Sequence, residues 1–240
     1  MRSSVSSGEP ADLGRPRAIN RHGLVDDVYE AIFNQLMALR IAPGARINVD
    51  NLVRDLSVSH TPIREALGRL EGEGLVVKTH LIGYSAAPQI TRRGFEELYE
   101  LRLLLEPDGA RRAAEAMNQD RLLVLRQIAD VMSVPQGGDE RMRYSAFARE
   151  DAVFHDKIME FAGNALIRGT LAHQHAHFHI FRLMFHARVT EEALDEHEAV
   201  MDAFTDGSGK AAEKAMREHI VRSRDRLLPA FEEARRDQAR

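Results

Sequence analysis

Residues 58–77 decide the fold: Val58-Ser59-His60-Thr61-Pro62-Ile63-Arg64-Glu65-Ala66-Leu67-Gly68-Arg69-Leu70-Glu71-Gly72-Glu73-Gly74-Leu75-Val76-Val77. Serine or threonine before a helix accepts its first free amide hydrogens, and proline is tolerated in the first turn. Ser59 or Thr61 therefore fits the cap, with Pro62 beside it. Apolar residues then recur at helical spacing: Ile63, Ala66, Leu67 and Leu70. The pattern predicts a capped helix that ends in glycine and continues into a short strand.

The side chains off this apolar face are small, polar or basic: His60, Thr61, Arg64 and Arg69. Hydroxyl, imidazole and guanidinium groups at the N-terminal end of a helix can reach phosphates or base edges in a major groove. The helix is therefore either a DNA recognition helix or a surface helix whose charges are only solvated. The neighbouring segments decide between these two readings.

Two helices are expected before this stretch and two strands after it. Apolar residues recur every three or four positions over 22–40, which predicts an amphipathic helix. A turn at Ala42-Pro43-Gly44 ends it, and a short helix opening at or beside Asp50 follows. Residues 75–78 and 83–87 predict strands joined by a loop at 79–82. Together these segments form a winged helix-turn-helix with a small β-wing.

The run Leu52-x3-Leu56-Ser57-Val58-Ser59-x-Thr61-Pro62-Ile63-Arg64-Glu65-Ala66-Leu67-x2-Leu70-x3-Gly74-Leu75-Val76 resembles the winged-helix domain of GntR-family transcription regulators. The resemblance implies a double-stranded DNA operator as partner. The residues expected at the DNA are Ser59, His60, Thr61, Arg64 and Arg69 of the helix, with His80 and Gly83 of the wing. Two departures concern base preference: His60 stands where many members have arginine, and Leu81 and Ile82 replace more polar wing residues.

Composition limits the class of protein. The chain has 240 residues, 44% of them hydrophobic and 29% charged, which suits one or two soluble domains. It contains no cysteine, so disulfides and cysteine-ligated zinc are excluded. No apolar run approaches the roughly 18 residues that span a bilayer, and residues 1–17 lack the apolar core of a signal peptide. We expect a disordered tail at 1–18, a cytoplasmic location and no membrane partner.

Charge does not by itself support DNA binding. The formal net charge is −4, and residues 1–90 carry 10 Lys and Arg against 10 Asp and Glu. DNA-binding domains are usually more basic than this. If DNA is the partner, the cations must gather on one face, and a homodimer must double a modest set of contacts.

The second half of the chain is helical in period throughout. We expect helices at 92–117, 119–133, 139–162, 164–188, 190–205 and 210–236, with Pro107 kinking the first and a break at 135–138. Short loops between helices favour an antiparallel bundle. The predicted fold is mainly α, with a winged helix-turn-helix domain at 19–88 and an all-α domain at 91–236.

Three of these helices carry groups that can bind a metal. Asp151 and His155 are four residues apart and leave the same face of one helix, while His197 and His219 lie on two others. An aspartate and three neutral imidazoles suit Zn²⁺, Ni²⁺ or Mn²⁺. The alternative is that each histidine is an ordinary surface or core residue, because spacing alone does not bring the helices together.

The runs Asp151-x2-Phe154-His155-x2-Ile158, Glu196-His197-x2-Val200 and Met216-x2-His219-Ile220 resemble the FCD ligand-binding domain of the FadR-like branch. The resemblance implies that Asp151, His155, His197 and His219 hold a divalent metal, Zn²⁺ in the first place, with room for an effector carboxylate or water. It also implies a pocket-facing arginine at Arg102. The alternative for Arg102 is a surface i,i+4 partner of Glu106.

Histidines alternate within the helix expected at 164–188: His173, His175, His177 and His179. At helical spacing His173 and His177 share one face and the other two share another, so the four cannot form one site. One face can line the effector pocket, with His177 or Arg182 as candidates, and the other meets solvent or a dimer partner. A fortuitous surface run explains the pattern equally well.

The sequence thus indicates a homodimeric DNA-binding regulator whose helical domain binds a metal and a small carboxylic-acid effector. Repression released by effector is the usual sense in the resembled family. One alternative is a metal-dependent hydrolytic or lyase enzyme that activates water; the winged helix and the lack of an obvious base argue against it. The other is a regulator whose metal only holds the bundle together.

Overall fold

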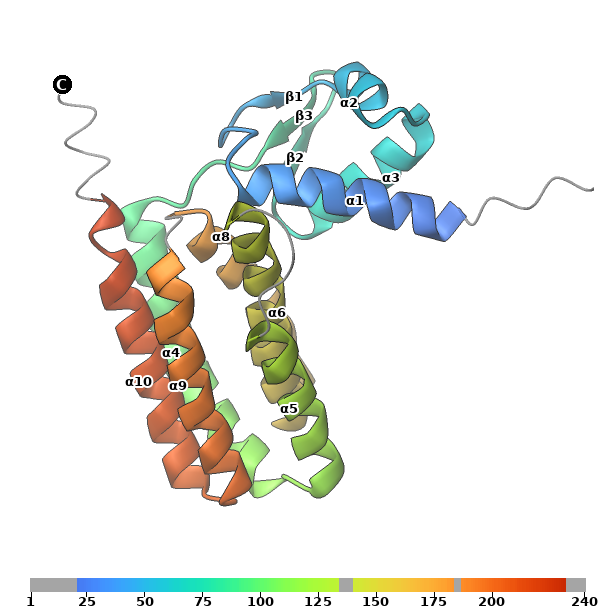
Figure 1. Cartoon of the computed structure of the whole chain (residues 1–240). Coiled ribbons are helices and arrows are strands. Elements are labelled where there is room, and N and C mark those ends of the chain that lie inside the picture. The colour runs from blue at the N-terminus through green and yellow to red at the C-terminus, as the bar shows by residue number, and fades with distance from the viewer. Residues whose placement is uncertain (1–20, 134–139, 184–186, 232–240) are drawn as a thin grey trace, which may run out of the picture.

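The computed structural model describes residues 21–133, 140–183 and 187–231. Its N-terminal part comprises α1 (Arg21–Met37), β1 (Arg46–Ile47), α2 (Val49–Leu56), α3 (His60–Gly72), β2 (Val76–Thr79) and β3 (Gly83–Ala86). These elements form a small domain at one end of a bundle of long helices (Figure 1). The predicted winged helix-turn-helix is confirmed.

Local backbone interactions set the turn between α2 and α3. Asn48 caps α2 by accepting hydrogen bonds from the amides of Asp50 and Asn51. Ser57 ends α2 in the left-handed region, at φ 54°, and so turns the chain toward α3. Ser59 occupies the N-cap of α3, but its hydroxyl makes no capping hydrogen bond within the described residues. The start of α3 therefore depends on packing more than on the predicted serine cap.

The apolar side of α3 is completely buried, as its spacing predicts. Ile63, Leu67 and Leu70 are each 0% exposed and share a core with Phe33 and Leu36 of α1. Burying side chains of this size contributes about 1.5–3 kcal/mol each. The opposite side of α3 remains exposed, so the fold orients the polar face of this helix toward solvent.

The wing has one strand more than predicted. β1 pairs antiparallel with β3, and β3 pairs with β2, so the sheet order is β1-β3-β2. The pairs are Arg46 with Ser85 and Ile47 with Tyr84. A strand of two residues has no alternation that a sequence can reveal, and only the burial of Ile47 shows that it belongs to the core.

The second part is the helical bundle: α4 (Arg92–Glu115), α5 (Gln119–Ser133), α6 (Glu140–Phe161), α7 (Ala165–Ala172), α8 (Ala176–Phe181), α9 (Ala187–Thr205) and α10 (Gly209–Leu227). In Figure 1, α4, α9 and α10 run side by side, and α5 runs beside α6. Thr91 caps α4 as expected, accepting a hydrogen bond from the Gly94 amide at 3.1 Å. α4 continues through Pro107, which is buried. The predicted mainly α fold with a helical second domain is confirmed.

The prediction of one continuous helix at 164–188 is wrong. α7 ends at Ala172, and α8 begins only after His175, whose φ of 47° lies in the left-handed region. Tertiary packing explains the break, because α8 takes its own direction and buries Ile180 and Phe181 in the bundle. The face expected for His173 and His177 is wrong for the same reason, because the two residues now belong to different helices, whereas His175 and His179 both lie beside Gly74.

Smaller differences occur at other helix ends. α10 ends at Leu227 instead of 236, shortly before Pro229, and residues 232–236 lie outside the described residues. The tail at 1–18 and the break at 135–138 also lie outside them. α9 begins at Ala187, three residues before its predicted start. Within the described ranges, no helix has the length and apolar character that a membrane crossing requires.

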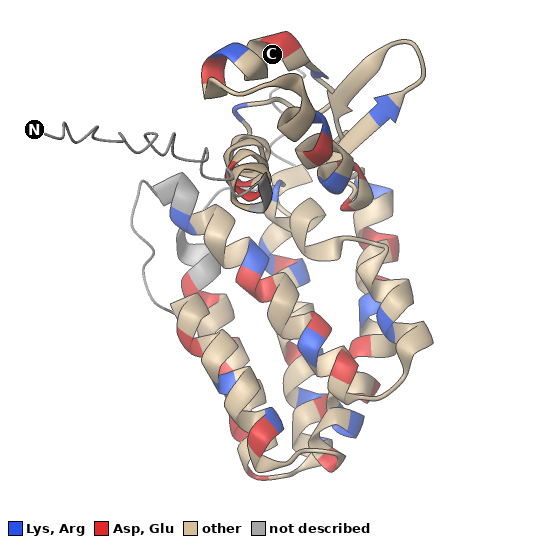
Figure 2. Ribbon diagram, turned by 90° about the vertical axis from the view of Figure 1, so that its right-hand side faces the viewer, with Lys and Arg blue, Asp and Glu red and all other residues tan. Residues whose placement is uncertain are grey.

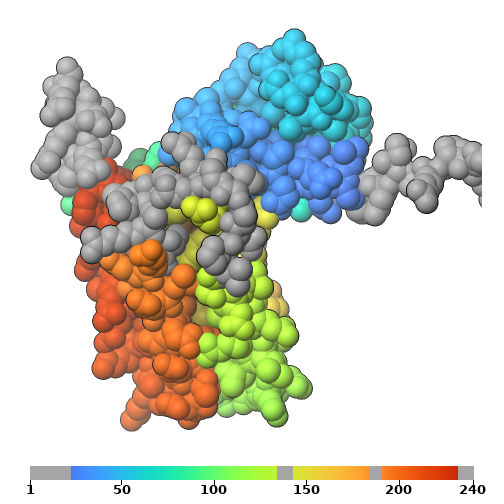
Figure 3. Space-filling view, viewed as in Figure 1, coloured from blue at the N-terminus to red at the C-terminus, as the bar shows by residue number. Residues whose placement is uncertain are grey.

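Charges of both signs are interspersed along the helices (Figure 2). Many of them form i,i+4 pairs on one helix, such as Arg93 with Glu97 and Arg111 with Glu115. Exposed pairs of this kind contribute at most about 1 kcal/mol each, so the apolar core holds the bundle together. Figure 3 shows the small domain in contact with the end of the bundle.

Candidate functional site

The four predicted metal ligands come together in the interior of the bundle. Asp151 and His155 project from α6, His197 from α9 and His219 from α10. All four are buried, with 2–4% of their surface exposed. The imidazole centroids of His197 and His219 are 4.6 Å apart, and those of His155 and His219 are 5.1 Å apart. Asp151 Oδ1 lies 3.2 Å from His197 Nε2.

The spacing of the imidazoles suits a single bound ion. One nitrogen from each of His155, His197 and His219 lies within 4.8 Å of the other two. These three imidazoles would hold one divalent cation together. The structure therefore brings together the residues that the sequence only placed on separate helices.

Carboxylates behind the cluster orient two of the imidazoles. His155 Nδ1 lies 2.7 Å from Glu106 Oε2, and His219 Nδ1 lies 2.9 Å from Glu196 Oε2. Because a carboxylate accepts, each Nδ1–H donates, which leaves Nε2 of each ring available to a ligand. A carboxylate behind a ligating histidine is the usual support of a metal site.

Two arginines hold these carboxylates in turn. Arg102 donates to both oxygens of Glu106, at 2.6 and 3.3 Å, and Arg226 donates to both oxygens of Glu196, at 2.5 and 3.0 Å. Burial alone would raise the pKa of Glu106, but Arg102 and His155 hold it well below its ordinary value. The pKa of Glu196 is likewise lowered, against burial, by His219 and Arg226. Both carboxylates are therefore ionised and fixed.

The protonation states also fit a metal. Burial lowers the pKa of His155 to about 3 and that of His219 to about 4, despite the nearby carboxylates. Burial would raise the pKa of Asp151, but the histidines His177, His197 and His155 hold it well below its ordinary value. At neutral pH His155 and His219 are therefore neutral and Asp151 is ionised, which are the forms that bind metals.

Buried nitrogen atoms without partners test the fit of a cation more directly. Within the described residues, His155 Nε2 and both nitrogens of His197 are buried and make no hydrogen bond. An unsatisfied buried polar atom costs about 1–3 kcal/mol, and such atoms need an explanation. A cation at the centre of the cluster would satisfy His155 Nε2 and one nitrogen of His197. The residues present fit a divalent metal.

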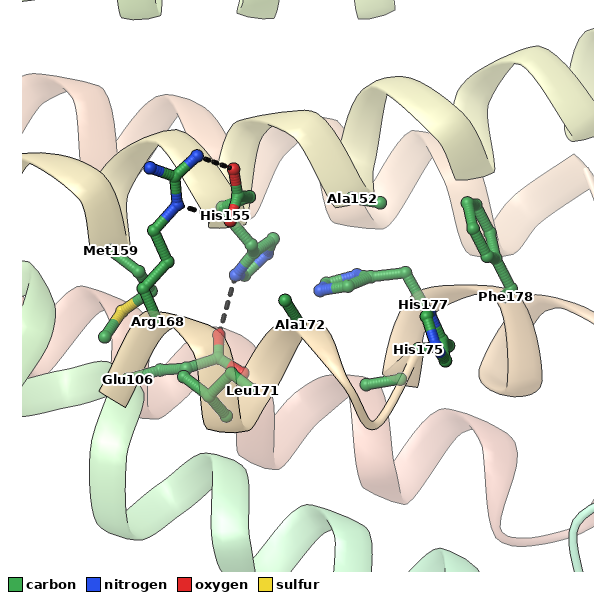
Figure 4. Close-up of a pocket in the computed structure, with 12 residues that line it drawn as sticks. Glu106, Ala152, His155, Met159, Arg168, Leu171, Ala172, His175, His177 and Phe178 are labelled. Carbon is green, nitrogen blue, oxygen red and sulfur yellow. Dashed lines mark hydrogen bonds and ion pairs between the residues drawn. The ribbon is translucent and has the colours of Figure 1, made fainter. Parts of the chain in front are cut away.

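A cavity of about 180 Å³ opens beside the cluster, between α4, α6, α7 and α8 (Figure 4). Its walls are mostly apolar, with contributions from Ala152, Met159, Leu171 and Phe178. Its polar lining residues are Glu106, His155, Asp156, Arg168, His175 and His177. Arg168 is engaged by Asp156 at 2.7 Å and by Glu160 at 2.9 Å. A small molecule in this cavity would therefore lie next to His155.

The predicted effector residues have three different positions. His177 lines the cavity, and its Nδ1 lies 2.5 Å from Asp151 Oδ2. Arg102 is an i,i+4 partner of Glu106, as one alternative had it, but the pair is buried instead of lying on the surface. Arg182 is also buried, and its Nη2 donates to the Ala87 carbonyl at 2.8 Å. Among these three residues, only His177 lines the cavity.

The expected DNA-contacting residues lie on the exposed side of the winged domain. Ser59, His60, Thr61 and Arg64 cluster at the N-terminal end of α3, and His80 and Gly83 lie in the wing. His60 Nε2 is 2.8 Å from Asp50 Oδ1. Arg69 pairs with Asp26 of α1 at 2.6 Å and covers the ring of Tyr29, so a DNA contact would require this pair to open.

Sequence reasoning missed three supports of these sites. Glu196 and Arg226 orient His219, and no spacing rule connects them because they lie on α9 and α10. Arg46 of the unpredicted β1 donates to the Ile82 carbonyl at 3.0 Å and so braces the wing. The signal for Glu196 was its place beside His197 in the motif, although adjacent residues on a helix point in different directions.

A winged helix-turn-helix with an exposed polar α3, joined to a separate helical domain, defines a DNA-binding transcription regulator. The family model of bacterial regulatory proteins, gntR family, matches residues 24–83, and the model of the FCD domain matches residues 97–222. The chain therefore belongs to the GntR family of transcriptional regulators, with an FCD domain as its second half. The resemblance read from the sequence is confirmed.

Individual relatives agree with this assignment. The chain is 25% identical over 214 residues to the uncharacterized HTH-type transcriptional regulator YdhC of Bacillus subtilis, with 86% of this chain and 94% of the relative covered. It is also 25% identical over 206 residues to the probable D-xylose utilization operon transcriptional repressor of Paenarthrobacter nicotinovorans, covering 85% of this chain and 89% of that one.

The fold of a solved structure is similar as well. E. coli McbR/YncC aligns with a TM-score of 0.64 at 18% identity, over 87% of this chain and 98% of its own. These families and relatives are regulators of transcription, so the chain is a regulator and not a metal-dependent enzyme.

Proposed function

We propose that the chain is a homodimeric transcriptional repressor that binds a divalent metal at Asp151, His155, His197 and His219. A small carboxylic acid, held in the adjoining cavity and at the metal, would modulate its affinity for the operator. The observation that carries the proposal is the convergence of these four buried groups, two of them oriented by carboxylates and two with unpartnered nitrogens.

The donor set indicates the kind of metal. Three imidazoles and one carboxylate are typical ligands of Zn²⁺, and the same set accepts Ni²⁺ or Mn²⁺. When bound, the cation supplies positive charge and free coordination positions for an anionic ligand. The chain's own residues do the rest: Glu106 and Glu196 fix the imidazoles, and the apolar walls of the cavity exclude water from the ligand.

The position of the cavity supports a carboxylate effector. His155 lines the cavity and belongs to the cluster, so one molecule can reach both. A carboxylate at the metal would leave its apolar remainder against residues such as Leu171 and Phe178. A volume of about 180 Å³ limits the effector to a small molecule.

The class of protein supports the proposed dimerisation and repression. A helix-turn-helix reads half-sites about one helical turn apart, and a two-fold dimer matches such an operator. The relative from Paenarthrobacter nicotinovorans is described as a probable repressor. Effector binding would release the operator if the effector binds better to an arrangement of the two DNA-binding domains that does not fit the half-sites.

Metal analysis of the purified protein is the first test. We expect about one divalent ion per chain, lost in His155→Ala and retained in His173→Ala, which removes an exposed imidazole from the end of α7. Full metal occupancy in His155→Ala would refute the site. A gel-shift assay on the chain's own upstream DNA, with and without small carboxylic acids, then tests regulation.

A purely structural metal would give a different pattern. In that case removal of the metal with EDTA would lower the melting temperature, while the affinity for carboxylic acids and their effect on DNA binding would stay the same. Under the proposal, removal of the metal changes the melting temperature, the affinity for carboxylic acids and their effect on DNA binding together.

A further inference from the structure

The short helix α8 lies between the candidate metal site and the DNA-binding domain. It comprises only Ala176–Phe181, and its N-cap residue, His175, has a left-handed backbone and makes no capping hydrogen bond through its side chain. Side chains of α8 and of the residues at its two ends point in different directions. Each of these directions ends at a contact with a different part of the protein.

One direction leads to the metal site. His177 Nδ1 lies 2.5 Å from Asp151 Oδ2, and the imidazoles of His155 and His177 are 4.6 Å apart. Figure 4 shows the ring of His177 directed toward His155. His155 belongs to two groups of possible ligands, one with His197 and His219 and the other with Asp151 and His177. The contact between His177 and Asp151 therefore lies within one of these groups and beside the other.

A second direction leads to the C-terminal end of α3. The imidazole of His175 is hydrogen-bonded to the backbone of Gly72, the last residue of α3. It also packs on Gly74, where an added Cβ would lie only 2.9 Å from His175 Cδ2. Because this contact is so close, a displacement of α8 either moves the end of α3 with it or breaks the contact between His175 and Gly74.

A third direction leads to α1, the helix on which α3 packs. The ring of Phe178 meets Phe33 edge-on, with centroids 5.4 Å apart and an interplanar angle of 77°. Phe33 is 0% exposed and belongs to the core that also contains Leu67 and Leu70 of α3. Phe178 therefore touches the support of α3, while His175 touches its end.

The C-terminal end of α8 holds the segment that links the two domains. Arg182 Nη2 donates to the Ala87 carbonyl at 2.8 Å, and Gln89 Nε2 donates to the Arg182 carbonyl at 2.8 Å. Phe181 packs on Phe147, which in turn stacks on the metal-site residue His197. Both ends of α8 are thus attached to the winged domain, while His177 contacts Asp151 directly and Phe181 reaches His197 through Phe147.

We propose that α8 transmits the occupancy of the metal site to α3, and that His177 is the residue that senses it. A ligand at Asp151 or His155 changes the position of His177, and α8 carries the change through His175 and Phe178 to α3 and α1. This proposal depends on the metal site proposed above. It assigns a role to two of the alternating histidines: His177 contacts the metal site, and His175 contacts the end of α3.

Hydrogen exchange on the full chain tests the proposal without a known operator or effector. The probe is the metal alone: the protein is stripped with EDTA and then loaded with Zn²⁺ or Mn²⁺. We expect the loaded wild type to show changed amide exchange at 69–75 as well as in α8, by roughly fivefold or more, the lower end of ordinary allosteric coupling. His177→Ala and His177→Asn keep the four proposed ligands, so they should still bind metal but lose the change at 69–75.

Phe178→Leu and a control variant make the test specific. Phe178→Leu keeps an apolar side chain and should reduce the change at 69–75, whereas Leu166→Ala, at an exposed position of α7 outside the cavity, should preserve it. Circular dichroism confirms that each variant is folded. Absence of metal binding in the wild type would refute the metal site and this proposal together. Metal binding with unchanged exchange at 69–75, or a change that survives both His177 variants, would refute the role of α8 alone.

Discussion

The buried imidazoles make the stability of the metal-free protein depend on pH in a predictable direction. His155 and His219 have folded-state pKa values of about 3 and about 4, lowered by burial, whereas an exposed histidine in the unfolded chain titrates near 6.5. Between these values the unfolded chain binds more protons than the folded one. The free energy of unfolding is therefore greatest above pH 6.5 and falls as the pH is lowered toward 4 and then 3.

The expected magnitude follows from the two pKa values. Lowering the pH from 6.5 to 5.5 should cost about 1 kcal/mol for each histidine, or about 2 kcal/mol for both. In a protein of this size 1 kcal/mol corresponds to roughly 2–4 °C in melting temperature, so we expect a fall of about 4–8 °C. His179, whose pKa burial lowers to about 4, adds a fall of the same sign. The ionised carboxylates of the site lose their contribution only at lower pH.

Thermal melts in EDTA at several pH values between 7 and 5 measure this dependence. His219→Gln keeps a polar side chain but cannot titrate, so its slope should be smaller by about 1 kcal/mol over the same pH unit. Comparing slopes removes any constant loss of stability in the variant. Lys214→Gln, at an exposed position of the same helix, is the matched control. Equal slopes for wild type and His219→Gln would show that His219 is not held neutral by burial.

Three further outcomes are expected. Arg64→Ala should weaken operator binding roughly tenfold or more without lowering the melting temperature, as measured by gel shift and thermal melt. Glu196→Gln should reduce metal affinity about 10–100-fold in a competition titration, whereas Glu198→Gln, an exposed position of the same helix, should not. Gly74→Ala should lower the free energy of unfolding in urea by about 1–2 kcal/mol, because φ at Gly74 is +69° and the imidazole of His175 occupies the space that a Cβ would need. The control Gly68→Ala should not destabilise the protein, because the space around Gly68 in α3 is open. Unchanged operator affinity in Arg64→Ala, unchanged metal affinity in Glu196→Gln or unchanged stability in Gly74→Ala would each contradict the reasoning behind that variant.

Prediction from sequence succeeded where local signals agree with tertiary packing. Thr61, Pro62 and the apolar spacing that follows all favour α3, and the core buries the same residues. It failed where packing alone decides. No glycine or proline lies between Leu171 and Phe181, so nothing local ends α7 at Ala172. The chain breaks there because α8 gains its own apolar contacts.

Prediction of the metal site also succeeded in part and failed in part. The spacing of Asp151 and His155 on one helix is visible in the sequence, and His197 and His219 were candidates on two other helices that the family resemblance supported. The hydrogen-bond partners of these residues could not be seen in the sequence, because they lie on other helices. Glu106 of α4 contacts His155 of α6, and Glu196 of α9 contacts His219 of α10. His177 was one of two candidates for the pocket, but its contact with Asp151 could not be predicted, since that contact depends on the break before α8.

The charges at α3 predict weak DNA binding by a single copy of the chain. Arg69 is engaged by Asp26 and His60 by Asp50, while Arg64 has no ion-pair partner among the described residues. Each phosphate that a cation neutralises adds about 0.9 to the salt dependence of log K, so a helix with few free cations gains little affinity.

The His60–Asp50 pair is exposed, and opening such a pair costs at most about 1 kcal/mol. His60 can therefore exchange Asp50 for a phosphate, and a two-fold dimer repeats each contact at a second half-site. A winged domain without net positive charge is thus compatible with operator binding, provided that two copies bind together.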